Sequence, residues 1–234
     1  MTAFPLLVVA LAAVQNPEPS DAAAWKLLGM AYAARGETEA SLAPFRRACE
    51  LNPKDEDACY YLGRNLWSVG RFEQALKALE QARPATPEAK LWRLYRAVGQ
   101  ALEALGRAGE AEQQFRLAIK LNRGQARPDE DPRIDFGVFL FRQGRLEEAL
   151  RPLEATVKEQ PGAARAHGEL GRVLLQLGRL EAATARLARA VELDPKYRAA
   201  RLLLGRAYLR LGRTAEGERE LELAAAGYGS EIVR

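Results

Sequence analysis

Residues 25–53 read WKLLGMAYAARGETEASLAPFRRACELNP, and this stretch decides the fold of the chain. Apolar side chains recur in it at steps of three and four residues, first around Leu28 and again around Phe45. This periodicity predicts two amphipathic helices. Between them, Gly36 can adopt the left-handed backbone conformation that closes a helix, and Pro53 then ends the unit. The stretch therefore predicts one helical hairpin.

The same hairpin recurs along the chain. Gly29 sits inside the first helix, where the missing side chain lets two helix axes approach closely. Gly63 lies 34 residues further on, and an equivalent glycine returns four more times at spacings of 34 to 38 residues. A fixed period of this length indicates a repeat architecture. We expect units near residues 22–55, 56–89, 92–125, 130–163, 164–197 and 198–231.

The residues of the first unit resemble the tetratricopeptide repeat (TPR) in type and in spacing. The positions that carry this resemblance are Trp25, Leu28, Gly29, Tyr32, Gly36, Phe45, Ala48 and Pro53. The resemblance implies an all-α protein, a right-handed superhelical solenoid of about six helix-turn-helix units over residues 21–234. Extra residues at 122–131 predict a bend between the third and fourth units, with Asp131 as an N-cap before Pro132.

The N-terminal segment follows a different pattern. Phe4 to Val14 is apolar on all sides, and a polar linker with two prolines follows it. About eleven apolar residues are too few to span a hydrocarbon core of roughly 30 Å, but they suit a secretory signal. We interpret residues 1–20 as a signal peptide and linker, although the first residues carry no Lys or Arg. A hydrophobic flap over the first repeat and a mis-assigned start are the alternatives.

The location of the protein depends on that segment. A true signal peptide predicts a periplasmic or secreted protein of the bacterial envelope, and otherwise we expect a cytoplasmic one. The compartment also bears on Cys49 and Cys59, which end one helix and begin the next. An oxidising compartment would allow a disulfide between them, whereas two small buried apolar side chains are the alternative.

Catalytic and cofactor motifs are missing from the sequence. It contains no phosphate-binding loop, no dinucleotide-binding glycine pattern and no metalloprotease motif. The single histidine, His167, occupies the place that Trp25 holds in the first unit, so we assign it to packing. We expect no enzyme activity, no metal site and no cofactor.

The TPR resemblance implies that the first helix of each unit lines a concave groove that binds a partner. The residues it places there are Lys26, Met30, Tyr60, Tyr61, Arg64, Trp67, Arg93, Arg96, Gln100, Arg172, Arg206 and Arg210. Aromatic and cationic groups together favour a protein or peptide of acidic and aromatic character. Packing between helices is the alternative role for the aromatic residues. Some TPR domains bind chaperone tails through lysine, asparagine and arginine residues, but Met30, Tyr61 and Ala97 interrupt that set here.

Two classes of function follow from this pattern. The first is a non-enzymatic interaction scaffold for a peptide or protein. The alternative is a regulatory or substrate-recruiting subunit of an envelope-associated enzyme complex. Nucleic acid is a weaker candidate because the net charge of +4 is modest and acidic residues are interleaved with the basic ones. The oligomeric state has no signal in the sequence.

Overall fold

The computed structural model describes residues 21–229, without the side chains of residues 227–229. Residues 1–20, to which the signal peptide was assigned, lie outside the described residues. Within 21–229 the chain forms twelve α-helices and no strand. The helices are α2 (Ala22–Ala34), α3 (Thr38–Leu51), α4 (Glu56–Ser68), α5 (Phe72–Ala82), α6 (Leu91–Ala104), α7 (Ala108–Asn122), α8 (Pro132–Arg142), α9 (Leu146–Glu159), α10 (Ala164–Gln176), α11 (Leu180–Leu193), α12 (Arg198–Arg210) and α13 (Thr214–Gly229). The predicted all-α solenoid of six helical hairpins is confirmed.

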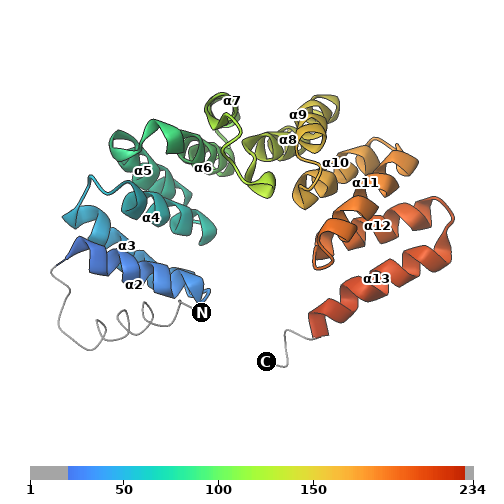
Figure 1. Ribbon diagram of the computed structural model, residues 1–234, viewed down its shortest axis with the longest axis horizontal. Coiled ribbons are helices and arrows are strands. Elements are labelled where there is room, and N and C mark those ends of the chain that lie inside the picture. Colours follow the sequence, from blue (N-terminus) through green and yellow to red (C-terminus); the bar gives the residue numbers. More distant parts are fainter. Residues whose placement is uncertain (1–20, 230–234) are drawn as a thin grey trace. The chain divides into compact units, whose positions relative to one another are not determined.

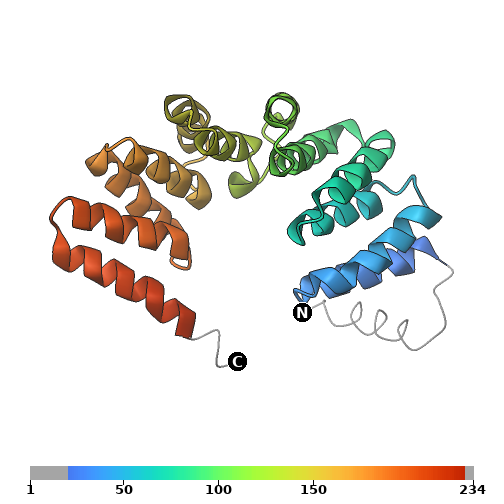
Figure 2. The same ribbon diagram turned by 180° about the vertical axis from the view of Figure 1, so that it is seen from behind.

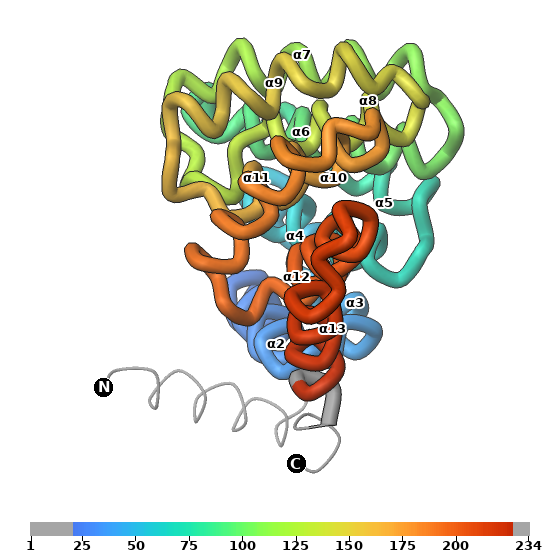
Figure 3. The backbone as a smooth tube through the Cα atoms, turned by 90° about the vertical axis from the view of Figure 1, so that its right-hand side faces the viewer, coloured from blue at the N-terminus to red at the C-terminus, as the bar shows by residue number. Residues whose placement is uncertain are grey.

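The chain falls into two compact units, which we call the N-terminal unit (Met1–Leu121) and the C-terminal unit (Asn122–Arg234). In the N-terminal unit, α3 contacts both its hairpin partner α2 and the next helix α4, and α5 bridges α4 and α6 in the same way (Figures 1 and 2). In the C-terminal unit, α8 to α13 stack in chain order, and α12 and α13 lie side by side (Figure 3). Each helix therefore packs mainly on its neighbours in the chain, as expected of a repeat array.

Each hairpin turns at a glycine with a positive φ angle. After α2, Gly36 has a φ of 78°, its N–H donates to the carbonyl of Ala33, and the N–H of Glu37 donates to the carbonyl of Tyr32. These bonds satisfy carbonyls that the end of a helix leaves free. The turns of the other five hairpins contain Gly70, Gly106, Gly144, Gly178 and Gly212, all with positive φ angles.

A second glycine brings the two helices of each hairpin together. A Cβ atom on Gly63 would lie 2.6 Å from Cγ of Leu79, and one on Gly171 would lie 2.5 Å from Cγ of Leu187. The facing leucines are almost fully buried. Burying a leucine contributes roughly 1.5–3 kcal/mol, and it requires the space that glycine leaves. The repeating glycine of the sequence is therefore one half of a packing contact.

The extra residues between hairpins form short 3₁₀ helices. Two of them, η1 (Arg83–Ala85) and η2 (Glu88–Lys90), lie between α5 and α6, and η3 (Pro128–Glu130) precedes α8. Asp131 caps α8 by accepting a hydrogen bond from the N–H of Arg133 at 2.9 Å, so the predicted N-cap is confirmed. The bend at 122–131 stays a prediction, since the two units are described separately.

Candidate functional site

Seven of the predicted binding residues lie on α4 and α6, the first helices of two successive hairpins, which contact each other, and six of the seven are considered together as one surface. We call the six residues, without Tyr61, the α4–α6 surface. It comprises Tyr60, Arg64, Trp67, Arg93, Arg96 and Gln100. On α4, the spacing of four and then three residues places the three side chains on one face of the helix.

Tyr60 is the buried centre of this surface, with 5% of its area exposed. Two guanidinium groups lie near its ring: that of Arg93 is 4.9 Å from the ring centroid, and that of Arg64 is 6.0 Å away. The face of an aromatic ring attracts cations at such distances. Tyr60 therefore supports two cations that come from neighbouring helices, and it offers little surface of its own.

Trp67 is the exposed aromatic residue of the surface. Its indole Nε1 donates a hydrogen bond to the backbone carbonyl of Gln100, with a distance of 3.2 Å. This bond fixes the edge of the ring across the α4–α6 contact, while 38% of the side chain remains exposed. A fixed, partly exposed indole is a surface on which an apolar or aromatic side chain can stack.

Arg64 and Arg93 differ in their electrostatic surroundings. Arg93 lies 3.3 Å from Asp57, so its charge is compensated within the chain. Arg64 is exposed, and among residues 21–229 no carboxylate forms an ion pair with it. Its cation is therefore available to a partner that brings a carboxylate.

Lys26 and Met30 lie on α2, so they are not part of the α4–α6 surface. Lys26 makes a 2.5 Å ion pair with Asp55, which links α2 to the residue that caps α4. Burial alone would raise the pKa of Asp55. The hydrogen bond and charge of Lys26, together with hydrogen bonds from backbone N–H groups of α4, outweigh this effect, so the pKa of Asp55 is lowered. Met30 is 43% exposed. Lys26 therefore acts as a link between repeats, and Met30 offers an apolar contact.

Two of the predicted residues on α4 and α6, Tyr61 and Arg96, make contacts within the fold. Tyr61 is half-buried beside the apolar cluster of the first two hairpins, with its ring centroid 5.7 Å from that of Phe45. The guanidinium of Arg96 lies 5.6 Å from the ring centroid of the buried Trp92. These contacts agree with the packing alternative for the aromatic residues of this region.

The C-terminal unit contains the other predicted residues, on α10 and α12. Arg172 lies 3.3 Å from Glu169 and 5.9 Å from the ring centroid of Phe141. Arg210 donates to the carbonyl of Leu175 at 3.0 Å. Arg206 is exposed and, within the described part of the chain, makes no ion pair. This unit therefore presents a second set of cations, without an exposed tryptophan.

Sequence reasoning missed the acidic residues that border the α4–α6 surface. Glu56 and Asp57 begin α4, and they pair with Lys90 and Arg93 at the start of α6. The separations of these pairs, 34 and 36 residues, are close to the repeat period. A search for opposite charges one period apart would have found them.

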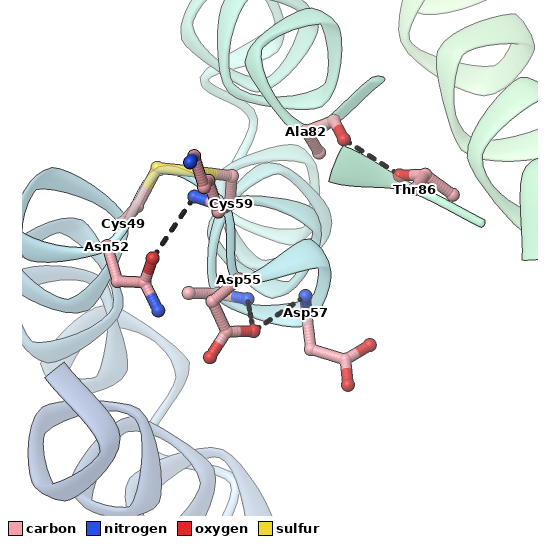
Figure 4. The surroundings of a disulfide bond; sticks show 9 residues. Cys49, Asn52, Asp55, Asp57, Cys59, Ala82 and Thr86 are labelled. Carbon is pink, nitrogen blue, oxygen red and sulfur yellow. Dashed lines mark hydrogen bonds between the residues drawn. A yellow bond between two sulfur atoms is a disulfide. The ribbon is translucent and has the colours of Figure 1, made fainter. Parts of the chain in front are cut away.

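The structure joins Cys49, near the end of α3, to Cys59, near the start of α4, by a disulfide (Figure 4). The two Cα atoms are 5.0 Å apart, within the usual range for such a bond. Both side chains are buried, with 2% and 0% of their areas exposed. The bond ties the first hairpin to the second beside Asp55, which accepts hydrogen bonds from the N–H groups of Asp57 and Ala58.

His167 is buried in the C-terminal unit, and its Nε2 lies 3.2 Å from the carbonyl oxygen of Pro161. In the described residues, no three potential metal ligands cluster. Nor does any described helix have the length and apolar character needed to cross a membrane. The packing position that the sequence predicts for His167 agrees with this environment.

Family models of the tetratricopeptide repeat match residues 32–98, 93–125, 140–196 and 174–229. Most of the chain is covered, so the protein belongs to the tetratricopeptide repeat family. Proteins of this family generally serve as scaffolds for protein–protein interaction. Over 64 residues the chain is 38% identical to Superkiller protein 3 of Saccharomyces cerevisiae. That match covers 27% of this chain and 4% of the relative.

Solved structures with the same fold cover more of the chain. A chain of the Cut9–Hcn1 hetero-tetramer of APC/C has a TM-score of 0.75 at 19% identity, covering 97% of this chain and 44% of that one. PilW, a type IV pilus biogenesis factor, has a TM-score of 0.72 at 18% identity, covering 91% and 96%. YrrB, a TPR protein described as having an unusual peptide-binding site, has a TM-score of 0.52 at 26% identity, covering 82% and 95%.

Proposed function

We propose that this chain is a non-enzymatic scaffold that binds an extended peptide or protein segment along the α4–α6 surface, in a groove formed by the first helices of the N-terminal unit. The observation that carries the proposal is the exposed guanidinium of Arg64, which has no acidic partner among the described residues and lies one helical turn from the exposed ring of Trp67. YrrB, the most similar in sequence of the structures compared above, supports peptide binding as the general activity.

The partner proposed has an acidic residue next to an aromatic or large apolar one. A carboxylate would pair with Arg64, and charge-assisted hydrogen bonds of this kind are about twice as strong as neutral ones. The neighbouring side chain would stack on Trp67, since Trp and Arg are frequent anchors of binding energy at interfaces. Tyr60 and Arg93 hold Arg64 and the α4 face in place beneath the bound segment.

The proposal disfavours nucleic acid. Glu56 and Asp57 lie beside the cations of α6 and would repel phosphates. A nucleic-acid ligand would show an affinity that falls steeply with salt, with a slope of roughly −0.7 to −0.9 per neutralised phosphate. A peptide that meets one unpaired arginine and one indole would instead depend weakly on salt.

The direct experiment is selection of displayed random peptides on the full chain, followed by the same selection on Trp67→Ala. We expect peptides with Asp or Glu near an aromatic residue, and at least about tenfold weaker binding of those peptides to the variant, because a central anchor contributes 2 kcal/mol or more. Arg151→Ala, on the exposed face of α9 in the other unit, is the control and should bind normally.

The alternative function, recruitment within an envelope-associated enzyme complex, predicts a different result. In that case the chain recovered from its native cells would hold one stoichiometric enzyme partner, and the peptide selection would yield no shared motif. Peptides that bind Trp67→Ala as well as the unmodified chain would place the site elsewhere.

A further inference from the structure

The first helices of the hairpins in the C-terminal unit, α8, α10 and α12, carry a positive charge that their acidic residues do not balance. Asp135 and Glu169 are the acidic residues of these three helices, and both are buried, with 6% and 8% of their areas exposed. Each is paired with an arginine, Asp135 with Arg165 at 2.6 Å and Glu169 with Arg172 at 3.3 Å. Helix α12, RAARLLLGRAYLR, contains four arginines and no acidic residue. The excess charge therefore lies mainly on α12.

Two of the four arginines of α12 make contacts with α13. Arg201 forms an ion pair with Glu220 at 2.8 Å, and Arg198 donates from its Nε to a backbone carbonyl of α13 at 3.1 Å. The other two, Arg206 and Arg210, are exposed. Among residues 21–229 neither of them forms an ion pair with a carboxylate. Their charges are therefore available to an acidic partner.

The hydrogen bond of Arg210 joins the cations of α12 to those of α10, which contacts α12 (Figure 1). Its Nη1 donates to the carbonyl of Leu175 on α10 at 3.0 Å. Arg172 lies one turn before Leu175, and Arg206 lies one turn before Arg210, so the three arginines line the same side of the contact between the two helices. We call Arg172, Arg206, Leu209 and Arg210 the α10–α12 surface.

The α10–α12 surface also has an apolar part. Leu209 is 40% exposed, and it packs against Gly217 of α13, where an added Cβ would lie 2.8 Å from its side chain. None of the four residues of the surface is aromatic, whereas proteins bind single-stranded nucleic acids largely by stacking the bases on aromatic side chains. An aliphatic side chain beside cations without acidic partners instead favours a peptide segment.

The spacing of Arg206 and Arg210 fits two carboxylates of an extended segment. Four residues of an α-helix advance by about 6 Å along its axis. Alternate residues of an extended chain point to the same side and are about 6.6–6.8 Å apart. A segment with acidic residues at alternate positions can therefore pair with both arginines at once, and an aliphatic residue beside them can contact Leu209.

We propose that the α10–α12 surface is a second binding site, which holds an acidic segment of a protein partner with at least two carboxylates and an aliphatic residue. The site shares no residue with the α4–α6 surface, so it goes beyond the proposed function and does not depend on it. The two sites select different segments. Trp67 offers an indole on which an aromatic side chain stacks, whereas the α10–α12 surface offers two cations and the aliphatic side chain of Leu209.

The test uses the full chain with Arg64→Glu, so that the α4–α6 surface contributes little. Random displayed peptides selected on this variant should carry acidic residues at alternate positions with Leu, Ile, Val or Met beside them. Calorimetric titration of such a peptide then compares Arg206→Glu with Arg151→Glu, each added to the same variant. Arg151 is exposed on α9 of the same unit, so the two proteins have equal net charge. We expect at least about tenfold weaker binding with Arg206→Glu and unchanged binding with Arg151→Glu. Equal affinities would overturn the proposal.

A second variant tests the apolar part without changing the charge. Leu209→Ala should weaken the same peptide by about three- to tenfold, because the alanine removes most of the aliphatic contact. An unchanged affinity would contradict that contact.

Competition tests whether the two sites are separate. An acidic peptide with an aromatic residue, at a concentration that saturates the unmodified chain, should leave the affinity of the acidic peptide with an aliphatic residue unchanged. Displacement of one peptide by the other would show a single site and overturn the proposal. So would binding of oligo-deoxythymidine that is lost in Arg206→Glu and falls steeply with salt, when no peptide is selected. Arg64→Glu tests the α4–α6 surface by itself, so the two proposals fail on different results.

Discussion

At the scale of single residues, one variable position of the repeat has a structural explanation. The place of Trp25 is taken by Cys59, Tyr95, Arg133, His167 and Arg201 in the other hairpins. Arg133 pairs with Asp131 and Glu159 at its own hairpin, whereas each of the other four contacts the segment that closes the hairpin before it. Cys59 is bonded to Cys49, the ring of Tyr95 lies 5.4 Å from the Arg83 guanidinium, His167 contacts the Pro161 carbonyl, and Arg201 donates to the Pro195 carbonyl. The sequence alone suggests that variable positions hold the function. In these four hairpins, the variable residue joins its hairpin to the preceding one.

The close-packing glycines predict a clear contrast between two substitutions. Gly171→Ala should destabilise the protein by about 1–3 kcal/mol, because the new Cβ would lie 2.5 Å from Leu187 Cγ in a filled core. Gly109→Ala should instead stabilise it by about 0.4–1 kcal/mol, because the helical Gly109 has open space around it. Urea unfolding of both variants measures this, and equal effects would refute the assigned role of the glycine.

His167 predicts acid sensitivity. Burial lowers the pKa of its imidazole, the hydrogen bond with Pro161 opposes that shift, and the charges of Arg186 and Arg189 reinforce it. Because the unfolded chain then binds the proton more readily, the free energy of unfolding should fall as pH drops below about 6.5. His167 is the only histidine, so His167→Gln should flatten this part of the stability curve. An unchanged slope in the variant would contradict the assignment.

At the scale of helices, the sequence predicts the order and type of elements well, because glycine positions repeat with the hairpin. It does not predict that Pro44 and Pro152 lie inside helices, as they do in α3 and α9. The carbonyls four residues before them belong to the exposed residues Ala40 and Glu148, where water can replace the missing donor. Sequence reasoning treats proline as a terminator, and solvent exposure of the partner carbonyl is a property of the folded chain.

The candidate site is less predictable for the same reason. The repeat register places Tyr60, Tyr61 and Arg93 near a binding surface, but register does not tell which side chain the neighbours cover. Tyr60 is buried under two guanidinium groups, Tyr61 packs beside Phe45, and Arg93 is compensated by Asp57. Only packing between hairpins decides that Arg64 and Trp67 remain exposed.

The Cys49–Cys59 disulfide links α3 to α4, and we expect it to contribute to the stability of the fold. Replacing both residues by alanine should lower the free energy of unfolding by about 2–3 kcal/mol, because the bond closes a short loop in the unfolded chain. In the unmodified protein the bond should resist reductant until denaturant is added, since both sulfurs are buried. Alkylation and mass spectrometry report this, and two free thiols in the native protein would contradict the bond.

At the scale of the whole molecule, the repeat array predicts that a destabilising substitution affects mainly the hairpins near it. Contacts connect each helix mainly to its neighbours in the chain, so a defect should weaken nearby hairpins most. Gly171→Ala should therefore speed hydrogen exchange in α10 and α11 more than in α2 to α5. The same increase everywhere would indicate a single cooperative unit and contradict this prediction.

The central claim of the proposed function is that the unpaired cation of Arg64 binds an acidic partner. The measurement that tests it most directly is calorimetric titration of a selected acidic peptide into the full chain, into Arg64→Glu and into Arg46→Glu. Arg46 is also exposed but lies on α3, a second helix of its hairpin, so the two variants have the same net charge. The account predicts that Arg64→Glu loses at least about tenfold in affinity while Arg46→Glu binds as the unmodified chain does. Equal affinity in both variants would contradict it.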